Sequence, residues 1–406
     1  MRVVKLPEQA KAWQVVDAVR ARGGASRAQV VADTGLPWAS VSTITEDLVR
    51  RRVLAEATGD NARIGRAGRR SALLRLPGEV GSFLGVEVGA SAIRVTQLDF
   101  NFRVRELGID PQPTGTDLAV VLTNIRAVMA RALAAIPAER LLGVGFAWPG
   151  SVDPTRGTAR FAPNLPLASD LTLSDLLTAE QSERLRLKPV VITRASECTA
   201  VAEQAIGGAD GHGRAERQIA VVTVGAAVGA GLILDGKLFH GRANAAGELG
   251  HIIVNEASAH RCGCGRSGCL EQEIAEPALL RKARERLGLG PEVTAEALAA
   301  AATAGDPGAQ QLFHELGEWL GKGLACVVNL LNPDLIVIAG GIAGAYDLFY
   351  PALRETLDRR CWRYGLANLR IERSRLGLDD TAIGAAIGAY HRLRTTTVLD
   401  HAPSQL

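Results

Sequence analysis

A histidine and three cysteines form the part of the sequence best suited to binding a metal ion. Cys262, Cys264 and Cys269 lie within eight residues, and His251 lies eleven residues before the first of them. Thiolate and imidazole are ligands that Zn²⁺ prefers, and four of them complete its tetrahedral coordination. The alternative is a set of buried cysteines without a metal, but free cysteines rarely cluster so tightly. The spacing therefore predicts one structural zinc ion per chain.

Arginines gather in a second segment, which is suited to contacting a polyanion. Two β-type runs at 53–56 and 71–76 predict a hairpin, and its Gly-containing tip carries four arginines, Arg63, Arg66, Arg69 and Arg70. Side chains of this kind contact phosphates or line a minor groove. This hairpin is the expected wing of a DNA-binding module.

Three helices are expected before the hairpin, over residues 9–22, 27–33 and 38–51. Ser26 and Gly35 are suited to begin and end the second helix. The third buries Val41, Ile44 and Leu48 by its periodicity. Its other face begins with the candidate base-reading residues Trp38, Ser40, Ser42 and Thr43.

The charge distribution supports DNA as the partner of this first module. Residues 1–77 carry 14 Lys and Arg against 7 Asp and Glu, whereas the remaining residues carry 32 against 36. A basic module on an acidic body predicts a polyanion partner for the module alone. A three-helix protein-interaction module with a solvated Arg face is the alternative. We interpret residues 1–77 as a winged helix–turn–helix that binds double-stranded operator DNA.

The rest of the chain predicts an α/β architecture. Alternating runs at 83–89 and 93–99 predict paired strands, a helical pattern occupies 117–136, and another strand is expected at 142–147. The most apolar stretch, 219–234, contains three glycines and predicts strand, turn and strand rather than a membrane span. The charged start of the chain lacks an apolar signal region, so we expect a cytoplasmic protein without a membrane partner.

Several motifs of this second module resemble the ROK (repressor, ORF, kinase) family of repressors and sugar kinases over about residues 10–395. The resemblance rests on the winged helix, the Cys cluster and four further motifs, at 149–153, 163–165, 246–251 and 332–334. It implies a two-lobed, actin-like (ribonuclease H-like) sugar-kinase fold. The first lobe would span 82–195 and be completed by a C-terminal helix at 380–395, and the second, zinc-containing lobe would span 196–379.

The resemblance also implies a sugar site between the lobes. Asn164, Glu248, His251 and Glu271 would hold sugar hydroxyls. His251 would bind zinc through one ring nitrogen and face the sugar with the other, so that the metal fixes its tautomer. A polyol needs several fixed carboxylate, amide and imidazole partners, which these residues supply.

Departures from the family pattern argue against catalysis. The family's kinases read Glu-Asn-Asp-Ala-Asn where this chain reads Thr193-Arg194-Ala195-Ser196-Glu197, so Ala195 replaces the aspartate that accepts the sugar proton. A positioned general base is typically worth about 10²–10⁴-fold in rate. The two phosphate loops also depart, at 87–91 and 225–231, which argues against ATP binding. Arg194 in the cleft wall would favour a phosphorylated or acidic sugar.

These observations predict a repressor of carbohydrate genes that responds to a sugar bound in a catalytically inactive cleft. The alternatives are an active ATP-dependent sugar kinase that also binds DNA, and a regulator whose vestigial cleft answers to another partner. A homodimer or homotetramer is expected, because symmetric regulators pair two DNA half-sites. The short linker at 77–81 would couple ligand binding to DNA binding.

Overall fold

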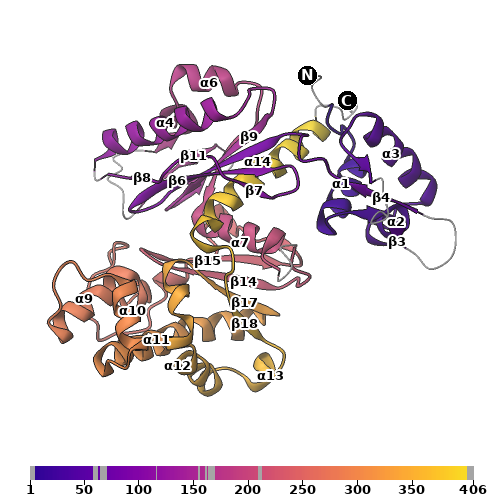
Figure 1. Cartoon of the computed structure of the whole chain (residues 1–406). Coiled ribbons are helices and arrows are strands. Elements are labelled where there is room, and N and C mark those ends of the chain that lie inside the picture. The colour runs from indigo at the N-terminus through magenta and orange to yellow at the C-terminus, as the bar shows by residue number, and fades with distance from the viewer. Residues whose placement is uncertain are drawn as a thin grey trace.

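The computed structural model describes residues 5–57, 63–64, 71–115, 117–153, 156–160, 162, 170–208 and 213–399. A small N-terminal module lies beside two larger α/β lobes (Figure 1). The last helix, α14 (Asp380–Leu399), runs along the first lobe and reaches the small module with its C-terminal end.

The N-terminal module has the element order predicted for a winged helix–turn–helix. The Ser26 hydroxyl accepts a hydrogen bond from the Gln29 N–H at 3.3 Å at the start of the second helix, and Gly35 ends that helix with φ +67°. The elements are α1 (Ala10–Ala21), β1 (Ala25–Ser26), α2 (Arg27–Thr34), α3 (Trp38–Arg50), β2 (Ala55–Glu56), β3 (Arg63–Ile64) and β4 (Ser71–Arg75). Strands β1, β2 and β3 all pair antiparallel with β4.

Two details of this module correct the sequence prediction. Thr45, not Ile44, takes the fully buried position on α3, and Ile44 is only partly buried. The Thr45 hydroxyl accepts a hydrogen bond from Arg27 Nε at 2.9 Å and donates one to the Ser42 carbonyl, so its polar atom has partners inside the module. The first wing strand begins only at Ala55, because the chain at 51–54 is still turning after α3.

The first lobe is built on a mixed sheet with the order β13-β9-β5-β6-β7, and β8 pairs with β6. Its strands are β5 (Ser82–Val88), β6 (Ala92–Asp99), β7 (Val104–Arg105), β8 (Gln112–Pro113), β9 (Leu141–Trp148) and β13 (Val190–Arg194). A smaller sheet and three helices complete the lobe: β10 (Val152–Asp153), β11 (Thr158–Ala159), β12 (Leu171–Thr172), α4 (Leu118–Ala135), α5 (Leu173–Leu176) and α6 (Ala179–Leu185).

Helices α4 and α14 pack on opposite faces of this sheet. Successive residues of β5 point to opposite faces, so neighbouring residues contact different helices. Leu84 and Val86 share a core with α4. On the other face, α14 approaches so closely that a Cβ on Gly85 would lie 1.7 Å from the Ala382 carbonyl oxygen, and one on Gly145 would lie 1.8 Å from that of Ala385. Two glycines therefore set the position of α14 on the sheet.

Helix α4 is long and apolar enough by composition to cross a membrane, but 33% of its residues are buried. Val121, Ile125 and Val128 belong to the core between this helix and the first sheet. Packing of one face in the lobe accounts for these apolar residues.

The second lobe is built on a sheet with the order β16-β15-β14-β17-β18. Its strands are β14 (Ile219–Val224), β15 (Val228–Leu234), β16 (Lys237–Leu238), β17 (Leu335–Ala339) and β18 (Arg370–Arg373), so the apolar stretch 219–234 is the predicted strand, turn and strand. Helix α7 (Ala195–Ile206) lies between this sheet and α14. The other elements are η2 (Arg242–Asn244), η3 (Leu249–His251), α8 (Glu271–Ile274), α9 (Glu276–Leu287), α10 (Ala295–Thr303), α11 (Pro307–Leu331), η4 (Gly341–Ala345), α12 (Tyr346–Arg360), α13 (Arg363–Leu366) and η5 (Gly377–Asp379).

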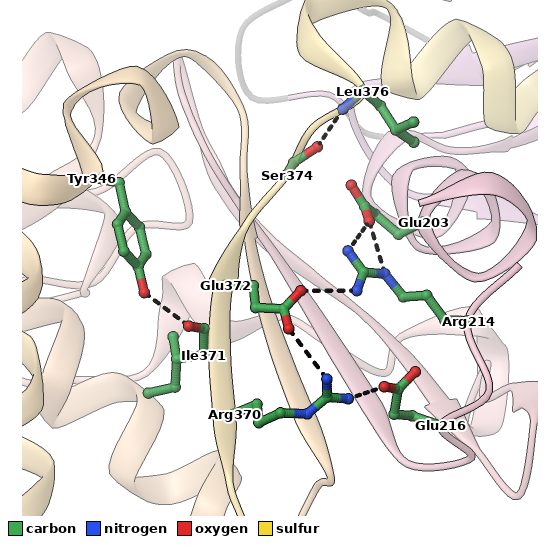
Figure 2. A network of polar contacts seen from close by, with 9 residues as sticks. All are labelled: Glu203, Arg214, Glu216, Tyr346, Arg370, Ile371, Glu372, Ser374 and Leu376. Carbon is green, nitrogen blue, oxygen red and sulfur yellow. Dashed lines mark hydrogen bonds and ion pairs between the residues drawn. The ribbon is translucent and has the colours of Figure 1, made fainter. Parts of the chain in front are cut away.

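An arginine joins α7 to the far strand of the second sheet. Figure 2 shows Arg214 between Glu203 of α7, at 2.8 Å, and Glu372 of β18, at 3.1 Å. Glu372 also contacts Arg370, which pairs with Glu216. Glu203 is fully buried, so Arg214 supplies the countercharge that this carboxylate requires.

Apolar contacts join the N-terminal module to α14. Trp13 of α1 packs edge-on against Tyr390 of α14, with ring centroids 5.6 Å apart, and both side chains belong to one buried cluster with Phe83 and Phe100 of the first lobe. The module and the first lobe therefore share a hydrophobic core.

Polar contacts reinforce this docking. Asp17 of α1 accepts hydrogen bonds from the Tyr390 hydroxyl at 2.5 Å and from Arg394 at 2.6 Å. The Arg20 guanidinium lies 4.2 Å from the ring centroids of both Phe102 and Tyr390. Cation–π contacts and charge-assisted hydrogen bonds thus hold α1 in a defined orientation on α14.

Candidate functional site

His251 and the three cysteines converge on one point in the second lobe. One ligand atom from each of His251, Cys262, Cys264 and Cys269 lies within 4.8 Å of the others. The His251 Nδ1–Cys262 Sγ distance is 3.5 Å and the Cys264–Cys269 Sγ distance is 3.6 Å. Ligands bound to zinc at 2.3 Å in a tetrahedron are about 3.8 Å apart. The four side chains therefore fit a metal ion.

Glycines allow the backbone to bring these thiols together. The Gly265 N–H donates to the Cys262 carbonyl at 2.9 Å and closes a tight turn, in which Gly265 has φ +88°. Gly268 has φ +79°, and a Cβ there would lie 2.2 Å from the Asn255 carbonyl oxygen. A side chain at Gly268 would displace the segment that carries Cys269, which forms an isolated β-bridge with Ile253.

The local environment favours the thiolate form of one cysteine. Burial raises the pKa of Cys264, but hydrogen bonds from the Arg266 backbone and side chain outweigh it and hold this pKa at about 6. A thiolate is the form that binds a metal. A cation at the cluster would favour ionisation of the other two thiols as well.

The second ring nitrogen of His251 faces away from the cysteines. While Nδ1 lies toward Cys262, Nε2 lies 3.9 Å from Oε2 of Glu248. The Glu248 side chain is half exposed, at 51%. A metal on Nδ1 would leave Nε2–H directed to the side where Glu248 meets solvent.

Of the other two expected sugar ligands, the structure describes Glu271 but not Asn164. Glu271 begins α8, and its Oε2 accepts a hydrogen bond from the Val228 N–H at 3.0 Å. This bond fixes the carboxylate beside the start of β15. Asn164 lies outside the described residues.

Arg194 has partners in the candidate site that the sequence did not predict. Its guanidinium is buried and contacts Glu248 Oε1 at 2.7 Å, Glu197 Oε1 at 3.2 Å and the Ala246 carbonyl. Two carboxylates compensate its charge, so the expectation that it favours an acidic sugar has no support from this geometry. Arg194 instead holds Glu248 in place. In the sequence, only the three-residue spacing of Arg194 and Glu197 indicated one of these ion pairs.

The Glu197 carboxylate is also engaged by a histidine. His240 Nδ1 lies 2.9 Å from Glu197 Oε1. This hydrogen bond raises the pKa of His240 above its ordinary value, against the effect of burial. Glu197 is therefore held by Arg194 and His240, and its carboxylate does not replace the aspartate missing at Ala195, the first residue of α7.

Two carboxyl groups lie near the first loop that departs from the family's phosphate-binding pattern. Burial raises the pKa of Glu87 to about 7, although Arg94 at 3.4 Å opposes the shift and Asp380 adds to it. Burial also raises the pKa of Asp380 to about 6. Negative charge on these groups would oppose nucleotide phosphates at this loop.

The N-terminal end of α3 presents the predicted base-reading residues at the surface. Trp38 is 55% exposed, Thr43 is exposed, and Ser40 and Ser42 are partly exposed. Arg63 begins β3, where its backbone alone is described, and Arg66, Arg69 and Arg70 lie outside the described residues.

The sequence model of the ROK family matches residues 83–391. The chain belongs to the ROK family. The match covers both lobes and most of α14, so the ROK fold accounts for the two-lobed architecture.

Relatives of this ROK chain include repressors and kinases. It is 29% identical over 364 residues to the xylose repressor of Caldicellulosiruptor bescii, covering 86% of this chain and 88% of that repressor. A ROK family transcriptional regulator, homologous to Escherichia coli Mlc, superposes with a TM-score of 0.76 at 25% identity over 97% of this chain and 99% of that structure. A ROK glucokinase from Streptomyces griseus, in complex with glucose and AMPPNP, superposes with a TM-score of 0.65 at 28% identity over 77% of this chain and all of that structure.

The extent of these matches separates the two groups of relatives. The regulator matches nearly the whole ROK chain, including the winged helix–turn–helix, whereas the kinase leaves about a quarter of it unmatched. The predicted family, the actin-like fold and the winged helix–turn–helix are thereby confirmed.

Proposed function

We propose that this protein is a transcriptional regulator, most simply a repressor of carbohydrate genes, that binds operator DNA and responds to a sugar between its lobes. The docking of α1 on α14 carries the proposal, because the same helix packs against α7 beside the cleft. The DNA-binding domain comprises residues 1–77. The first lobe comprises 82–195 with 380–395, and the second comprises 196–379.

In this proposal α3 reads base edges through Trp38, Ser40, Ser42 and Thr43. Arg63, Arg66, Arg69 and Arg70 of the wing contact phosphates or the minor groove. The exposure of the N-terminal end of α3 supports this role. A homodimer or homotetramer in the cytoplasm would place two such modules on a pseudo-palindromic operator.

The sugar is held by Asn164, Glu248, His251 and Glu271, and we expect it to be neutral. The charge of Arg194 is already compensated by Glu197 and Glu248, so the cleft wall offers hydrogen bonds rather than a free cation. Zinc bound by His251, Cys262, Cys264 and Cys269 has a structural role here. It fixes the His251 tautomer, so that Nε2–H is available to a sugar hydroxyl.

The cleft is proposed to bind without catalysing phosphoryl transfer. Ala195 offers no proton acceptor, and Glu197 is committed to two cationic partners. An assay that couples ADP release to NADH oxidation should show no turnover with any sugar that binds. Turnover near about 1 s⁻¹, within the ordinary range of enzymes, would favour an active kinase instead.

A thermal-shift series tests the sugar site directly. Neutral pentoses and hexoses, including xylose and glucose, are added to the wild type, to Glu248→Ala and to Glu256→Ala, which removes an exposed carboxylate outside the cleft. A sugar at 100 times its Kd should stabilise the wild type and the Glu256→Ala control by about 2.7 kcal/mol and leave Glu248→Ala unchanged. Equal stabilisation of all three proteins would refute the assigned site.

A further inference from the structure

A cavity of about 890 Å³ lies where the N-terminal module meets both lobes. Its wall includes Asp17 and Arg20 of α1, Asn101 and Phe102 of the first lobe, and parts of α7, β16 and α14. None of Glu248, His251 and Glu271 lines it, so it is separate from the sugar cleft. Its volume is within the range of small-molecule sites.

The wall of this junction cavity is predominantly cationic. It contains four Lys and Arg side chains and one carboxylate, that of Asp17. Arg214 is neutralised from outside the wall by Glu203 and Glu372 (Figure 2). Asp17 must compensate both Arg20 and Arg394. Lys237 is exposed, and no ion pair to it is found among the described residues. The remaining positive charge favours an anionic ligand.

Arg20 gives a second indication that a ligand belongs here. This residue is 92% buried, since only 8% of its surface is exposed. Its Nε donates to the Phe100 carbonyl and its Nη1 contacts Asp17, but its Nη2 has no hydrogen-bond partner in the described part of the chain. A buried guanidinium nitrogen without a partner is costly. Because Nη2 has almost no accessible surface, an anion in the adjoining cavity would offset this cost by charge attraction and not by a direct hydrogen bond.

Uncharged polar groups in the same wall indicate what else the ligand carries. Asn101, Thr193, Gln204 and Thr395 contribute amide and hydroxyl groups beside the apolar surfaces of Phe102 and Val201. The amide nitrogens of Asn101 and Gln204 and the hydroxyl of Thr395 donate to backbone carbonyls, so their oxygen atoms serve as hydrogen-bond acceptors. Such groups bind hydroxyls. The wall therefore suits a small molecule that combines one anionic group with a hydroxylated body.

We propose that the junction cavity is a second ligand site, which binds a phosphorylated polyol of about the size of a hexose phosphate. The positive charges of Lys237, Arg20 and Arg394 attract the phosphate, and the amide and hydroxyl groups bind the polyol. Because the wall is shared by α1, α7 and α14, a ligand there stabilises one placement of the N-terminal module relative to the lobes. The protein would then bind a neutral sugar and a phosphorylated sugar at different sites.

Calorimetric titration of the full-length protein with glucose 6-phosphate tests this site without DNA, so its outcome does not depend on the regulator proposal. Glu248→Ala serves as the parent protein, because it lacks a key residue of the cleft. We expect the parent to bind glucose 6-phosphate, and Lys237→Glu in the parent to weaken binding at least about tenfold, since it places a negative charge in the wall. Arg392→Glu reverses an exposed charge on α14 outside the wall and should leave binding unchanged.

Two further arms identify the group that is recognised. Glucose lacks the phosphate and should not compete with glucose 6-phosphate for the junction cavity. Inorganic phosphate lacks the polyol and should compete only weakly. The proposal is overturned if the parent does not bind glucose 6-phosphate, if Lys237→Glu binds it as tightly as the parent, or if glucose competes equally well.

Discussion

Four side chains from a 19-residue segment are positioned to bind a metal, and this local arrangement makes a direct prediction. Cys262→Ser should reduce the zinc content from about one per chain to near zero, because a hydroxyl is a poor zinc ligand. It should also lower the free energy of unfolding by more than about 2 kcal/mol. Elemental analysis and thermal unfolding measure the two effects.

Cys326→Ser is the matched control for the zinc prediction. Cys326 lies on α11, outside the cluster, and is partly buried, whereas Cys262 is buried. The control should keep its zinc. Gently purified wild type without zinc, or Cys262→Ser with a full complement, would contradict the four-ligand site.

The raised pKa of Glu87 predicts a pH-dependent stability. Its folded-state pKa is about 7, against an ordinary 4.5. The stability that the protonated Glu87 contributes is therefore fully present below about pH 4.5 and is lost as the pH rises from there through 7. Glu87→Gln should therefore gain stability relative to wild type between pH 5 and pH 8, by up to about 3 kcal/mol.

Chemical denaturation of both proteins at the two pH values measures this difference. Glu79→Gln, at an exposed glutamate in the turn before β5, is the control and should show no such gain. Parallel stability curves for Glu87→Gln and wild type would mean that Glu87 ionises normally in the folded protein.

Sequence spacing could predict the cluster of His251 and three cysteines but not the partners of Arg194. The four residues of this cluster are close in sequence, and their chemistry suits a metal ion better than other roles. Arg194 and Glu248, in contrast, are 54 residues apart and meet only because α7 begins beside the chain segment before η3. A buried arginine can pair with any carboxylate that the fold brings near, so its partner follows from tertiary structure.

At the scale of elements, the contact of α14 with the first sheet depends on two glycines. Gly85→Ala should destabilise the protein by about 1–3 kcal/mol or more, because its Cβ would overlap the Ala382 carbonyl and α14 would have to move. Gly388→Ala is the control, since a Cβ there would lie 3.8 Å from Val191 and the added methyl favours the helix.

Thermal unfolding of both variants tests this contact. The Gly388→Ala protein should be as stable as wild type or slightly more stable. If Gly85→Ala unfolds at the wild-type temperature, α14 does not approach β5 as closely as the structure shows.

Helix boundaries in the N-terminal module could be predicted within one residue, and the caps at Ser26 and Gly35 are local signals of this kind. The docking of this module on α14 could not. Trp13 fits an apolar helix face in any three-helix module, and only the folded chain shows that Tyr390 lies against it. Buried polar positions such as Thr45 were also missed, since helical periodicity treats threonine as surface.

For the whole molecule, the docked α1–α14 contact predicts that sugar binding and DNA binding are coupled. Operator DNA selected on the purified protein should change its affinity by about 5–150-fold, or 1–3 kcal/mol, when the sugar saturates the cleft. Asp17→Asn should reduce this change, because it weakens the contacts with Tyr390 and Arg394. Fluorescence anisotropy with and without sugar measures both.

Asp33→Asn is the control for the coupling prediction. Asp33 pairs with Arg22 inside the N-terminal module, so its loss should leave the coupling at the wild-type value. Equal operator affinities with and without sugar in the wild type would show that the cleft and the DNA module act independently.

The partner of α1 is the last helix of the chain, and this order has a consequence for synthesis. Asp17 and Tyr390 are 373 residues apart, so at about 5–20 residues per second the ribosome completes α14 some tens of seconds after α1. During that interval the Trp13 face has no α14 to cover it and is a surface that chaperones can recognise. A message truncated before α14 would yield a DNA-binding module that lacks this contact and that the lobes could not control.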